Sequence, residues 1–341
     1  MILPPELDAP LKIGPVELGN RVFLAPLSGI TDEPFRLRAN GHGAGLVVSE
    51  MVASGELTKG RDKSALRIRR PDVPVHVVQL AGREAMALAE AARLGVGEGA
   101  DIIDINMGCP AKKVTGGYCG SALMRDPDHA LGLIEAVVAA VSVPVTVKMR
   151  LGWDESALNA PMIARRAEEA GVRMVTVHGR TRCQFYEGRA DWRAIARVKQ
   201  AVSVPVVANG DISCAREARE ALEQSGADAV MIGRAHCGAP WTAGEIAASF
   251  SEVPVAGKPA EAELPDYVAS HYEDMLALYG AESGARQARK HLGWYLDRHA
   301  PHTPDTLRQT IMRSLVPAEV LAALREAFSR AAELAELGAA A

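Results

Sequence analysis

The feature that most constrains the fold is a repeated alternation of short apolar segments with longer amphipathic ones. Eight segments rich in Val and Ile are typical of buried strands: residues 22–25, 46–49, 75–79, 102–105, 145–148, 174–178, 206–209 and 229–232. Apolar residues at three- and four-residue spacing indicate helices over 84–94, 128–141, 161–170, 192–201 and 215–224. Eight units with almost continuously apolar strands predict a closed parallel (β/α)8 TIM barrel, an α/β fold.

Two sequence phrases support repetition of one structural unit. VSVPVTVKMR (Val141 to Arg150) and VSVPVVANGD (Val202 to Asp211) each read as a helix end, a proline turn and a buried strand. The competing α/β architecture is the open doubly wound sheet, which usually carries G-x-G-x-x-G after its first strand. Here the first strand runs into APLSG (Ala25 to Gly29), which does not fit that pattern. The barrel is therefore the preferred architecture.

The alternation stops near Ala248, after which four Pro and Gly residues follow within a short stretch and no further strand pattern is found. The chain of 341 residues is long enough for a barrel of about 250 residues and a smaller appendage. We expect a barrel catalytic domain over 1–250, a linker over 251–264 and a C-terminal helical domain over 265–341.

Composition narrows the class of protein. A hydrophobic fraction of 48% with 23% charged residues is ordinary for a globular chain. No segment approaches the ~20 consecutive apolar residues of a membrane span, and the N-terminus lacks a signal-peptide pattern, so we expect a cytoplasmic protein without membrane contact. Five cysteines without a C-x-x-C pair predict neither a disulfide framework nor a metal site. A net charge of −4 argues against indiscriminate nucleic-acid binding, although local basic patches remain.

Polar residues follow almost every predicted strand. In barrels of this class the C-terminal strand ends form the active site, whereas the opposite rim serves stability. In chain order these ends are Pro26-Leu27-Ser28, Glu50-Met51, Gln79, Asn106 with Cys109, Lys148 with Arg150, His178 with Arg180, Asn209-Gly210-Asp211 and Gly233-Arg234. This asymmetry between the two rims is the one expected of an enzyme.

The last two strand ends are suited to a phosphate. Loops after the seventh and eighth barrel strands commonly bind one through backbone N–H groups. Gly210 and Gly233 allow close approach of the backbone, and Arg234 adds a charged donor. Asp211 or Ser213 could instead cap the following helix. We favour the phosphate site.

Lys148 and His178 each end an apolar strand. For Lys148 three interpretations stay open: a Schiff-base nucleophile, a cation facing an anionic cofactor, or a side chain that reaches solvent at the rim. His178 is either a buried core residue or part of an anion-facing site, and the nearby Arg180 favours the second.

Cys109 lies between Gly108 and Pro110, directly after a strand. A free thiol with a pKa of about 8.5 is mostly protonated at neutral pH and is therefore a better proton donor than nucleophile. No His/Asn partner of a cysteine hydrolase is evident, and a buried cysteine can also be simple packing. Position alone leaves both interpretations open.

The C-terminal segment GARQARKHLGWYLDRH (Gly284 to His299) interleaves basic and aromatic residues. Arg286, Arg289 and Lys290 lie close to an aromatic pair there, which suits a polyphosphate backbone. A solvated helix face anchored by its Trp is the alternative.

Nine stretches together resemble the bacterial tRNA-dihydrouridine synthases, most closely their B type, the group that includes nitrogen-regulation homologues. They run in order from residue 25 to residue 295: APLSGITDEPFR, VQLAG, DINMGCPAKKV, GSALMRD, VTVKMRLGW, VTVHGRTR, VVANGDI, MIGRA and ARKHLGWY. The sequence departs from the family at Leu27-Ser28, where the family often has Met-Ala, and at Cys119, where a small residue such as Ala is common.

The resemblance implies an FMN-dependent barrel whose helical domain helps to bind tRNA. We expect a monomer. The resemblance also implies that NADPH-reduced flavin transfers hydride to C6 of D-loop uridines, and that Cys109 protonates C5 as general acid. Flavin contacts would be Pro26, Leu27, Ser28, Gln79, Lys148 and His178, and the flavin phosphate would be surrounded by Asn209, Gly210, Asp211, Gly233 and Arg234. Contacts to the RNA substrate would be Asn106, Lys112, Lys113, Arg180, Arg286, Arg289 and Lys290.

Two other functions compete with this one. A dihydroorotate dehydrogenase-like flavin barrel acts on the same pyrimidine bond in a small molecule, but the basic and aromatic helical tail argues against it. A tRNA-binding protein without turnover would use the barrel only as a scaffold. The joint presence of Cys109, Lys148 and the phosphate loops argues against that second function.

Overall fold

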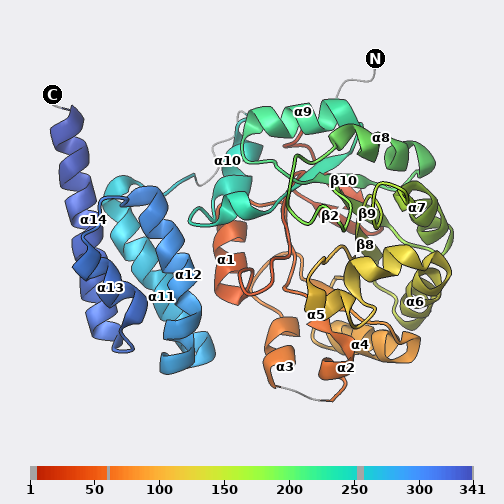
Figure 1. Ribbon diagram of the computed structural model, residues 1–341, viewed down its shortest axis with the longest axis horizontal. Helices are drawn as coiled ribbons and strands as arrows, with labels where there is room; N and C mark the ends of the chain where they lie inside the picture. Colours follow the sequence, from red (N-terminus) through yellow and green to blue (C-terminus); the bar gives the residue numbers. More distant parts are fainter. Residues whose placement is uncertain (1–5, 60–61, 252–256, 340–341) are drawn as a thin grey trace. The chain divides into compact units, whose positions relative to one another are not determined.

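The computed structural model describes residues 6–59, 62–251 and 257–339. The chain divides into two compact units, each treated by itself below. The first unit comprises Met1–Ala235 and Thr242–Ala256, and the second comprises His236–Trp241 and Gly257–Ala341. Figure 1 shows the strands of the first unit surrounded by helices, and the second unit built from helices.

The first unit contains a parallel sheet with the strand order β4-β3-β11-β10-β9-β8-β7-β6-β5. These strands are β3 (Val22–Leu24), β4 (Leu46–Val47), β5 (Val52–Ala53), β6 (Val77–Ala81), β7 (Ile102–Met107), β8 (Val145–Arg150), β9 (Met174–His178), β10 (Val206–Asn209) and β11 (Ala229–Ile232). Each of the eight predicted strand regions contributes to this sheet, and the predicted TIM-barrel class is confirmed.

Two short strands close the barrel. β4 pairs with β3 on one side, β5 pairs with β6 on the other, and a bridge joins Val48 to Val77 between them. The strand predicted over 46–49 matches β4 and this bridge, and β5 is a further short strand that the sequence did not predict. Polar contacts lie between the two pieces. The Ser49 hydroxyl accepts from the backbone N–H of Gln79, and the Glu50 carboxylate accepts from that of Gly29.

Helices follow the strands around the barrel: α1 (Glu33–Gly41), α4 (Ala85–Gly97), α6 (Pro127–Ala140), α7 (Ala160–Glu169), α8 (Trp192–Ala201), α9 (Ala215–Ser225) and α10 (Thr242–Ala248). Short helices α2 (Ser54–Leu57), α3 (Asp62–Ile68) and α5 (Lys112–Thr115) lie in the strand-to-helix connections. Three helices begin at an aspartate whose side chain accepts from a backbone N–H in the first turn: Asp32, Asp126 and Asp191.

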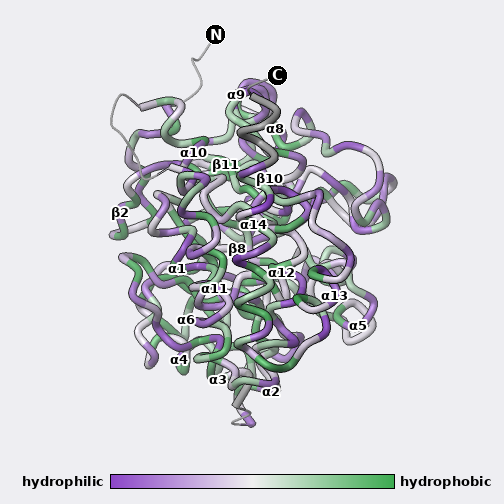
Figure 2. The backbone as a smooth tube through the Cα atoms, turned by 90° about the vertical axis from the view of Figure 1, so that its left-hand side faces the viewer, coloured by the Kyte–Doolittle hydropathy of each residue, from purple (hydrophilic) through white to green (hydrophobic). Residues whose placement is uncertain are grey.

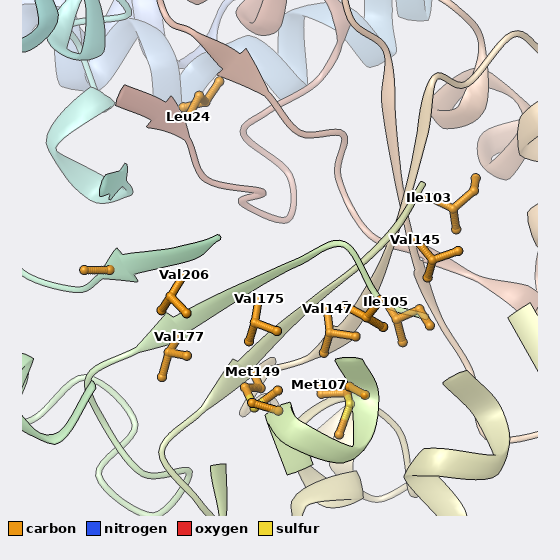
Figure 3. Packing of buried hydrophobic residues seen from close by; sticks show 14 of the residues in the cluster. Leu24, Ile103, Ile105, Met107, Val145, Val147, Met149, Val175, Val177 and Val206 are labelled. Atoms are coloured by element: carbon orange, nitrogen blue, oxygen red, sulfur yellow. The ribbon is translucent and has the colours of Figure 1, made fainter. Parts of the chain in front are cut away.

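The central strands separate two kinds of environment by their period-two alternation. Alternate residues such as Ile105, Val147 and Val175 pack outward in the main apolar core, as Figure 3 shows. The residues between them point into the barrel. There, Ile102 and Met174 at the strand starts belong to an apolar cluster with residues of the hairpin β1 (Leu11–Ile13) and β2 (Val16–Leu18).

Further along the strands the barrel interior becomes polar. Asp104 and Thr146 come first, followed by Asn106, Lys148 and His178 toward the C-terminal ends. Since all but His178 are under 10% exposed, the sequence places buried hydrogen-bonding groups directly beneath the rim at which the site forms.

The second unit is built around α11 (Leu264–Tyr279), α12 (Ala281–His299), α13 (Asp305–Arg313) and α14 (Pro317–Ala339). Hydrophobic and hydrophilic residues alternate along the helical turns (Figure 2), and the apolar faces form a separate core. This core includes Leu264, Val268, Tyr272, Leu292 and Leu324.

The predicted domain boundaries differ from these units in two places. His236–Trp241 belongs with the helices, because Trp241 is buried in their core, with its ring centroid 5.6 Å from that of Tyr267 in an edge-to-face contact and 5.4 Å from that of His299. The predicted linker over 251–264 lies partly outside the described residues, and its end already forms a helical turn at Glu261–Glu263. No helix within the described residues is both long and apolar enough to cross a bilayer.

Candidate active site

A cavity of about 1000 Å³ opens at the C-terminal ends of the barrel strands. Its lining includes seventeen of the predicted residues together with their neighbours. Those residues are Pro26, Leu27, Ser28, Gln79, Asn106, Cys109, Lys113, Lys148, His178, Arg180, Asn209, Gly210, Asp211, Gly233 and Arg234, with Met51 and Arg150 from the strand-end series. The structure therefore brings almost all of the predicted barrel residues into one cavity.

A chain of buried side chains forms the cavity floor on β6 and β7. Gln79 Nε2 donates to Asp104 Oδ2 at 2.7 Å, and Asn106 Nδ2 donates to Gln79 Oε1 at 2.7 Å. The Thr146 hydroxyl donates to the other Asp104 oxygen at 2.6 Å. Burial raises the pKa of Asp104, while these hydrogen bonds and the charge of Lys148 oppose that rise.

Lys148 lies on the same floor, on β8. Its ammonium donates to Asn209 Oδ1 at 2.8 Å, and Asn209 Nδ2 in turn donates to the Met231 carbonyl. Burial lowers the pKa of Lys148 to about 8, against the raising effect of Asp104. Because the side chain is only 9% exposed, the interpretation of a lysine that reaches solvent at the rim is wrong.

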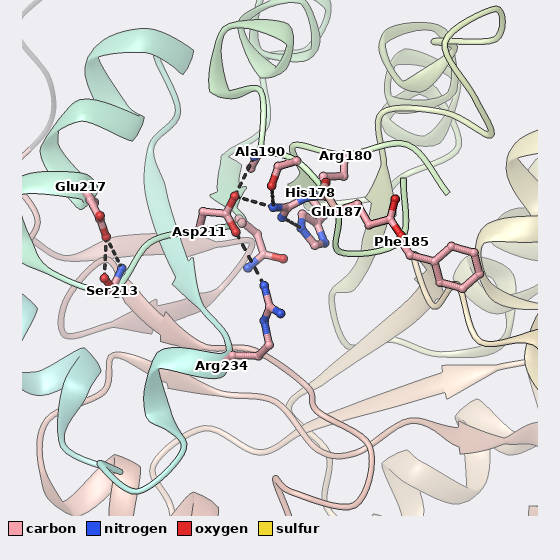
Figure 4. A network of polar contacts seen from close by, with 12 residues as sticks. His178, Arg180, Phe185, Glu187, Ala190, Asp211, Ser213, Glu217 and Arg234 are labelled. Carbon is pink, nitrogen blue, oxygen red and sulfur yellow. Dashed lines mark hydrogen bonds and ion pairs between the residues drawn. The ribbon is translucent and has the colours of Figure 1, made fainter. Parts of the chain in front are cut away.

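A second polar network joins the ends of β9, β10 and β11 (Figure 4). Asp211 Oδ2 accepts from Arg180 Nη2 at 2.6 Å and from the Ala190 backbone, and its other oxygen lies 3.8 Å from Arg234. Arg180 Nη1 contacts the His178 ring at 3.3 Å. Burial, followed by the charges of Lys148, Arg150, Arg180 and Arg234, lowers the pKa of His178 well below 6.5, so the ring is neutral at pH 7.

Arg180 and Asp211 differ in part from their predicted roles. The Arg180 guanidinium is 2% exposed and also donates to the carbonyls of Glu187 and Gly188, so its hydrogen bonds hold the loop after β9. The alternative helix-cap roles of Asp211 and Ser213 are wrong, because α9 begins after Cys214 and no side chain caps it.

Two glycines border the cavity with different surroundings. Gly210 has φ +115°, and a Cβ there would meet the His178 ring at 2.7 Å. A Cβ on Gly233 would meet no protein atom within 4 Å, so there is space for a further group beside this residue at the cavity rim. Arg234 follows it with a side chain that is 61% exposed.

Cys109 sits in a tightly held turn beside the cavity. Asn106 Oδ1 accepts from the backbone N–H groups of Gly108 and Cys109, at 3.2 and 3.0 Å. The Cys109 carbonyl accepts from both the backbone and the hydroxyl of Ser121. Arg150 adds a donor to the Gly108 carbonyl at 2.9 Å. The thiol is half-buried and free.

Four basic residues assigned to the RNA lie outside the cavity lining. Lys112 is exposed on α5, next to the lining residue Lys113. The other three belong to α12 of the helical unit, where Arg286 pairs with Glu282 at 2.7 Å and Arg289 donates to the Arg313 carbonyl. Lys290 contacts Gln287 at 3.4 Å.

One site residue that the sequence did not single out is aromatic. Tyr186 is 52% exposed at the cavity, with the guanidiniums of Arg150 and Arg234 lying 5.5 and 5.0 Å from its ring. Arg150 itself is buried and donates to the carbonyls of Thr181 and Phe185. Arg150 lies two residues after Lys148 on the same face of β8, as its place in the predicted strand-end series implied.

Known protein families, related sequences and solved structures include proteins similar to this chain. The family described as Dihydrouridine synthase (Dus) matches residues 23–333. The chain belongs to the dihydrouridine synthase family. It is 58% identical to a probable tRNA-dihydrouridine synthase of Rhizobium leguminosarum bv. phaseoli, over 92% of this chain and 96% of the relative. It is 47% identical to the tRNA-dihydrouridine synthase B of Xanthomonas axonopodis pv. citri, over 93% of this chain and 96% of the relative.

The family resemblance predicted from the nine sequence stretches is thereby confirmed, including the presence of B-type members among the relatives. Solved structures with a similar fold include a morphinone reductase mutant in complex with tetrahydroNAD, at a TM-score of 0.55 and 14% identity over 72% of this chain and 92% of that one. TcOYE with pHBA gives a TM-score of 0.56 and 15% identity, over 74% of this chain and 95% of that one. At such low identity these likenesses show the barrel fold alone.

Proposed function

We propose that this dihydrouridine synthase reduces the C5=C6 bond of D-loop uridines in tRNA, with bound FMN as cofactor and NADPH as reductant. The observation that carries the proposal is that one cavity is lined by Cys109, whose turn is held by hydrogen bonds, by the buried Lys148, and by Gly233 with Arg234 at the rim. The relatives at 58% and 47% identity are named as enzymes of this reaction. We further propose that the protein is cytoplasmic, where its tRNA substrate is found, and that it acts as a monomer.

The residues present fit a flavin mononucleotide. A planar, largely apolar ring with polar edges matches a cavity lined by Pro26 and Leu27 on one side and by Gln79 and Lys148 at the floor. The Lys148 cation would face the ring edge on which negative charge accumulates. A Cβ at Gly233 would meet no protein atom within 4 Å, and Arg234 offers an exposed cation, so this rim has the space and the charge that would hold the phosphate.

The chemistry that the flavin supplies when bound is hydride transfer, here to C6 of the uracil. That carbon is electrophilic because its double bond is conjugated with the C4 carbonyl, so negative charge develops at C5 and O4. Cys109 Sγ donates the proton to C5 as general acid. The hydrogen bonds from Gly108 and Cys109 to Asn106 hold the thiol's backbone in place for this transfer.

The RNA contacts follow from the geometry of the rim. A uridine has to leave its base stack to enter a barrel mouth, so the surrounding RNA must be gripped through its phosphates. Lys112 and Lys113 are exposed on α5, which directly follows the Cys109 turn. We assign the same role to Arg286, Arg289 and Lys290 of the helical unit.

The test is direct. Purified protein should be yellow, its flavin absorbance should be bleached by NADPH, and it should form dihydrouridine in tRNA isolated from a strain that lacks the modification. NADH in place of NADPH tests the reductant assignment. A colourless protein that does not bind added FMN would contradict the proposal. Turnover of free orotate or uridine without tRNA would indicate a flavin barrel that acts on a small molecule instead.

A further inference from the structure

Asp104 is buried in the barrel beneath the proposed flavin site and has no role in the chemistry described above. It is 4% exposed and lies one alternation before Asn106 on the inward face of β7. Register places it beside Gln79 of β6, and Gln79 completes the link to Asn106. The three side chains form one continuous line of hydrogen bonds that ends at the backbone of Cys109.

The direction of this line is set by its chemistry. Backbone N–H groups can only donate, so the N–H groups of Gly108 and Cys109 require an oxygen from Asn106. The Asn106 nitrogen then faces Gln79, and the Gln79 nitrogen faces position 104. Each amide accepts a hydrogen bond at its oxygen and donates one through its nitrogen. A series of two such amides that accepts from backbone N–H groups at one end must therefore donate to an acceptor at the other end. This argument holds without relying on how either amide was oriented.

We propose that Asp104 is a positioning residue that fixes the orientation of both amides and thereby the turn that carries Cys109. The inference rests on the proposed function, in which the Cys109 thiol must meet C5 of the uracil. Loss of the acceptor would leave the Gln79 N–H without a partner in a buried environment, so both amides could rotate. Asn106 would then no longer present a fixed oxygen to the two backbone donors, and the thiol would lose its position.

A competing role for Asp104 is electrostatic, because its charge acts on Lys148 on the neighbouring strand. Two substitutions separate the roles. Asp104→Leu has a similar shape and no acceptor. Asp104→Asn has no charge but can turn its oxygen to Gln79, since the Thr146 hydroxyl, which now donates to Asp104, can accept from an amide nitrogen instead.

The primary measurement is alkylation of Cys109 by iodoacetamide in the FMN-bound protein, followed by mass spectrometry. The exposed Cys183 of the same chain is the internal reference. We expect Asp104→Leu to change the Cys109:Cys183 rate ratio several-fold and to lower kcat on tRNA by roughly tenfold to a hundredfold, as misplaced reacting groups do, with KM little changed. Asp104→Asn should keep the wild-type ratio and most of kcat.

A third variant keeps the test decisive if Asp104→Leu does not fold. Gln79→Glu places a carboxylate oxygen opposite the Asp104 carboxylate, where neither can donate, and should therefore change the Cys109:Cys183 rate ratio. Gln79→Glu combined with Asp104→Asn restores a donor at that contact and should return the ratio toward wild type. The inference is overturned if Asp104→Asn behaves like Asp104→Leu, if neither changes the ratio, or if the double variant fails to restore it. Absence of dihydrouridine formation by wild-type protein would contradict the proposed function instead, because the thiol measurement needs no turnover.

Discussion

The ammonium of Lys148 lies 2.8 Å from the amide oxygen of Asn209, across the width of the barrel strand that separates them. The acceptor in this contact is neutral, because the side chain of Asn209 carries no charge. Burial therefore dominates the energetics of Lys148 and lowers its pKa to about 8. A buried cation held by a neutral partner is well suited to receive an anionic ligand.

The first prediction concerns the energetic cost of that cation. Lys148→Met should raise the free energy of unfolding of the flavin-free protein by about 1–3 kcal/mol at pH 7, because the folded state binds this proton less tightly than the unfolded chain. Between pH 8 and about 10.5 the difference should shrink, since folded Lys148 loses its proton first. Denaturant unfolding at several pH values measures this, with the exposed Lys12→Met as the control.

The same variant should bind FMN more weakly. If Lys148 faces the negative edge of the flavin, its removal lowers affinity even though it stabilises the protein. Fluorescence titration with FMN measures the dissociation constant. Equal affinity for wild type and Lys148→Met would remove Lys148 from the cofactor site.

The second prediction separates cofactor binding from proton donation. Cys109→Ala should retain the yellow colour and bleaching by NADPH, yet lower the rate of dihydrouridine formation by roughly 10²- to 10⁴-fold, the usual contribution of a general acid. Cys183→Ala is the matched control, because that thiol is exposed and is assigned no role in the reaction. A single-turnover assay with prereduced enzyme reports the step directly. Unchanged turnover by Cys109→Ala would return Cys109 to simple packing.

Sequence periodicity was sufficient for the strands and therefore for the barrel rim. Residues at strand ends converge in any parallel barrel, so Gln79, Cys109, Lys148 and Gly233 could be placed in one site before any geometry was known. The hydrogen bonds that link these residues could not be predicted from the sequence. The Gln79–Asp104 contact depends on the register of β6 against β7, and Arg180 depends on the path of the loop after β9.

The boundary between the units was missed for a related physical reason. His236–Trp241 directly follows the last barrel strand, so local pattern assigns it to the barrel. Its place is set instead by distant contacts, since Gly238 lies against the Trp294 carbonyl and Trp241 is buried with α11 and α12. Contacts between residues so far apart in the sequence produce no periodic pattern that a sequence-based prediction could recognise.

The third prediction is a loss of stability in mild acid. Burial lowers the pKa of His76 to about 4, opposed by its hydrogen bond to the Ile68 carbonyl. Below its ordinary value of 6.5, the unfolded chain binds a proton that the folded protein excludes, so stability falls as pH drops. From pH 7 to pH 5 this single group should account for about 2 kcal/mol.

His76→Gln should flatten that part of the pH dependence, because the glutamine amide can donate to Ile68 without titrating. The exposed His129→Gln should leave it unchanged. Urea unfolding at pH 7, 6 and 5 provides the comparison. A slope that is the same in wild type and His76→Gln would show that other groups dominate acid unfolding.

The fourth prediction uses two glycines to locate the phosphate. Gly233→Ala adds a Cβ that meets no protein atom within 4 Å, so the melting temperature should stay within about 2 °C of wild type. If the backbone of Gly233 approaches the FMN phosphate, the added methyl group should weaken FMN binding by roughly tenfold or more. Riboflavin, which lacks the phosphate, should bind both proteins similarly.

Gly210→Ala is the comparison variant, because an added Cβ at this position does meet other protein atoms. Its φ of +115° and the predicted 2.7 Å approach to the His178 ring should lower the free energy of unfolding by about 1–3 kcal/mol, whether or not a ligand is bound. Calorimetry and FMN titration on both variants give the answer. Weak FMN binding by Gly233→Ala with unchanged riboflavin binding places the phosphate at this rim, because the added Cβ meets no protein atom within 4 Å. Unchanged FMN affinity would move the phosphate away from Gly233 and leave Arg234 without its assigned role.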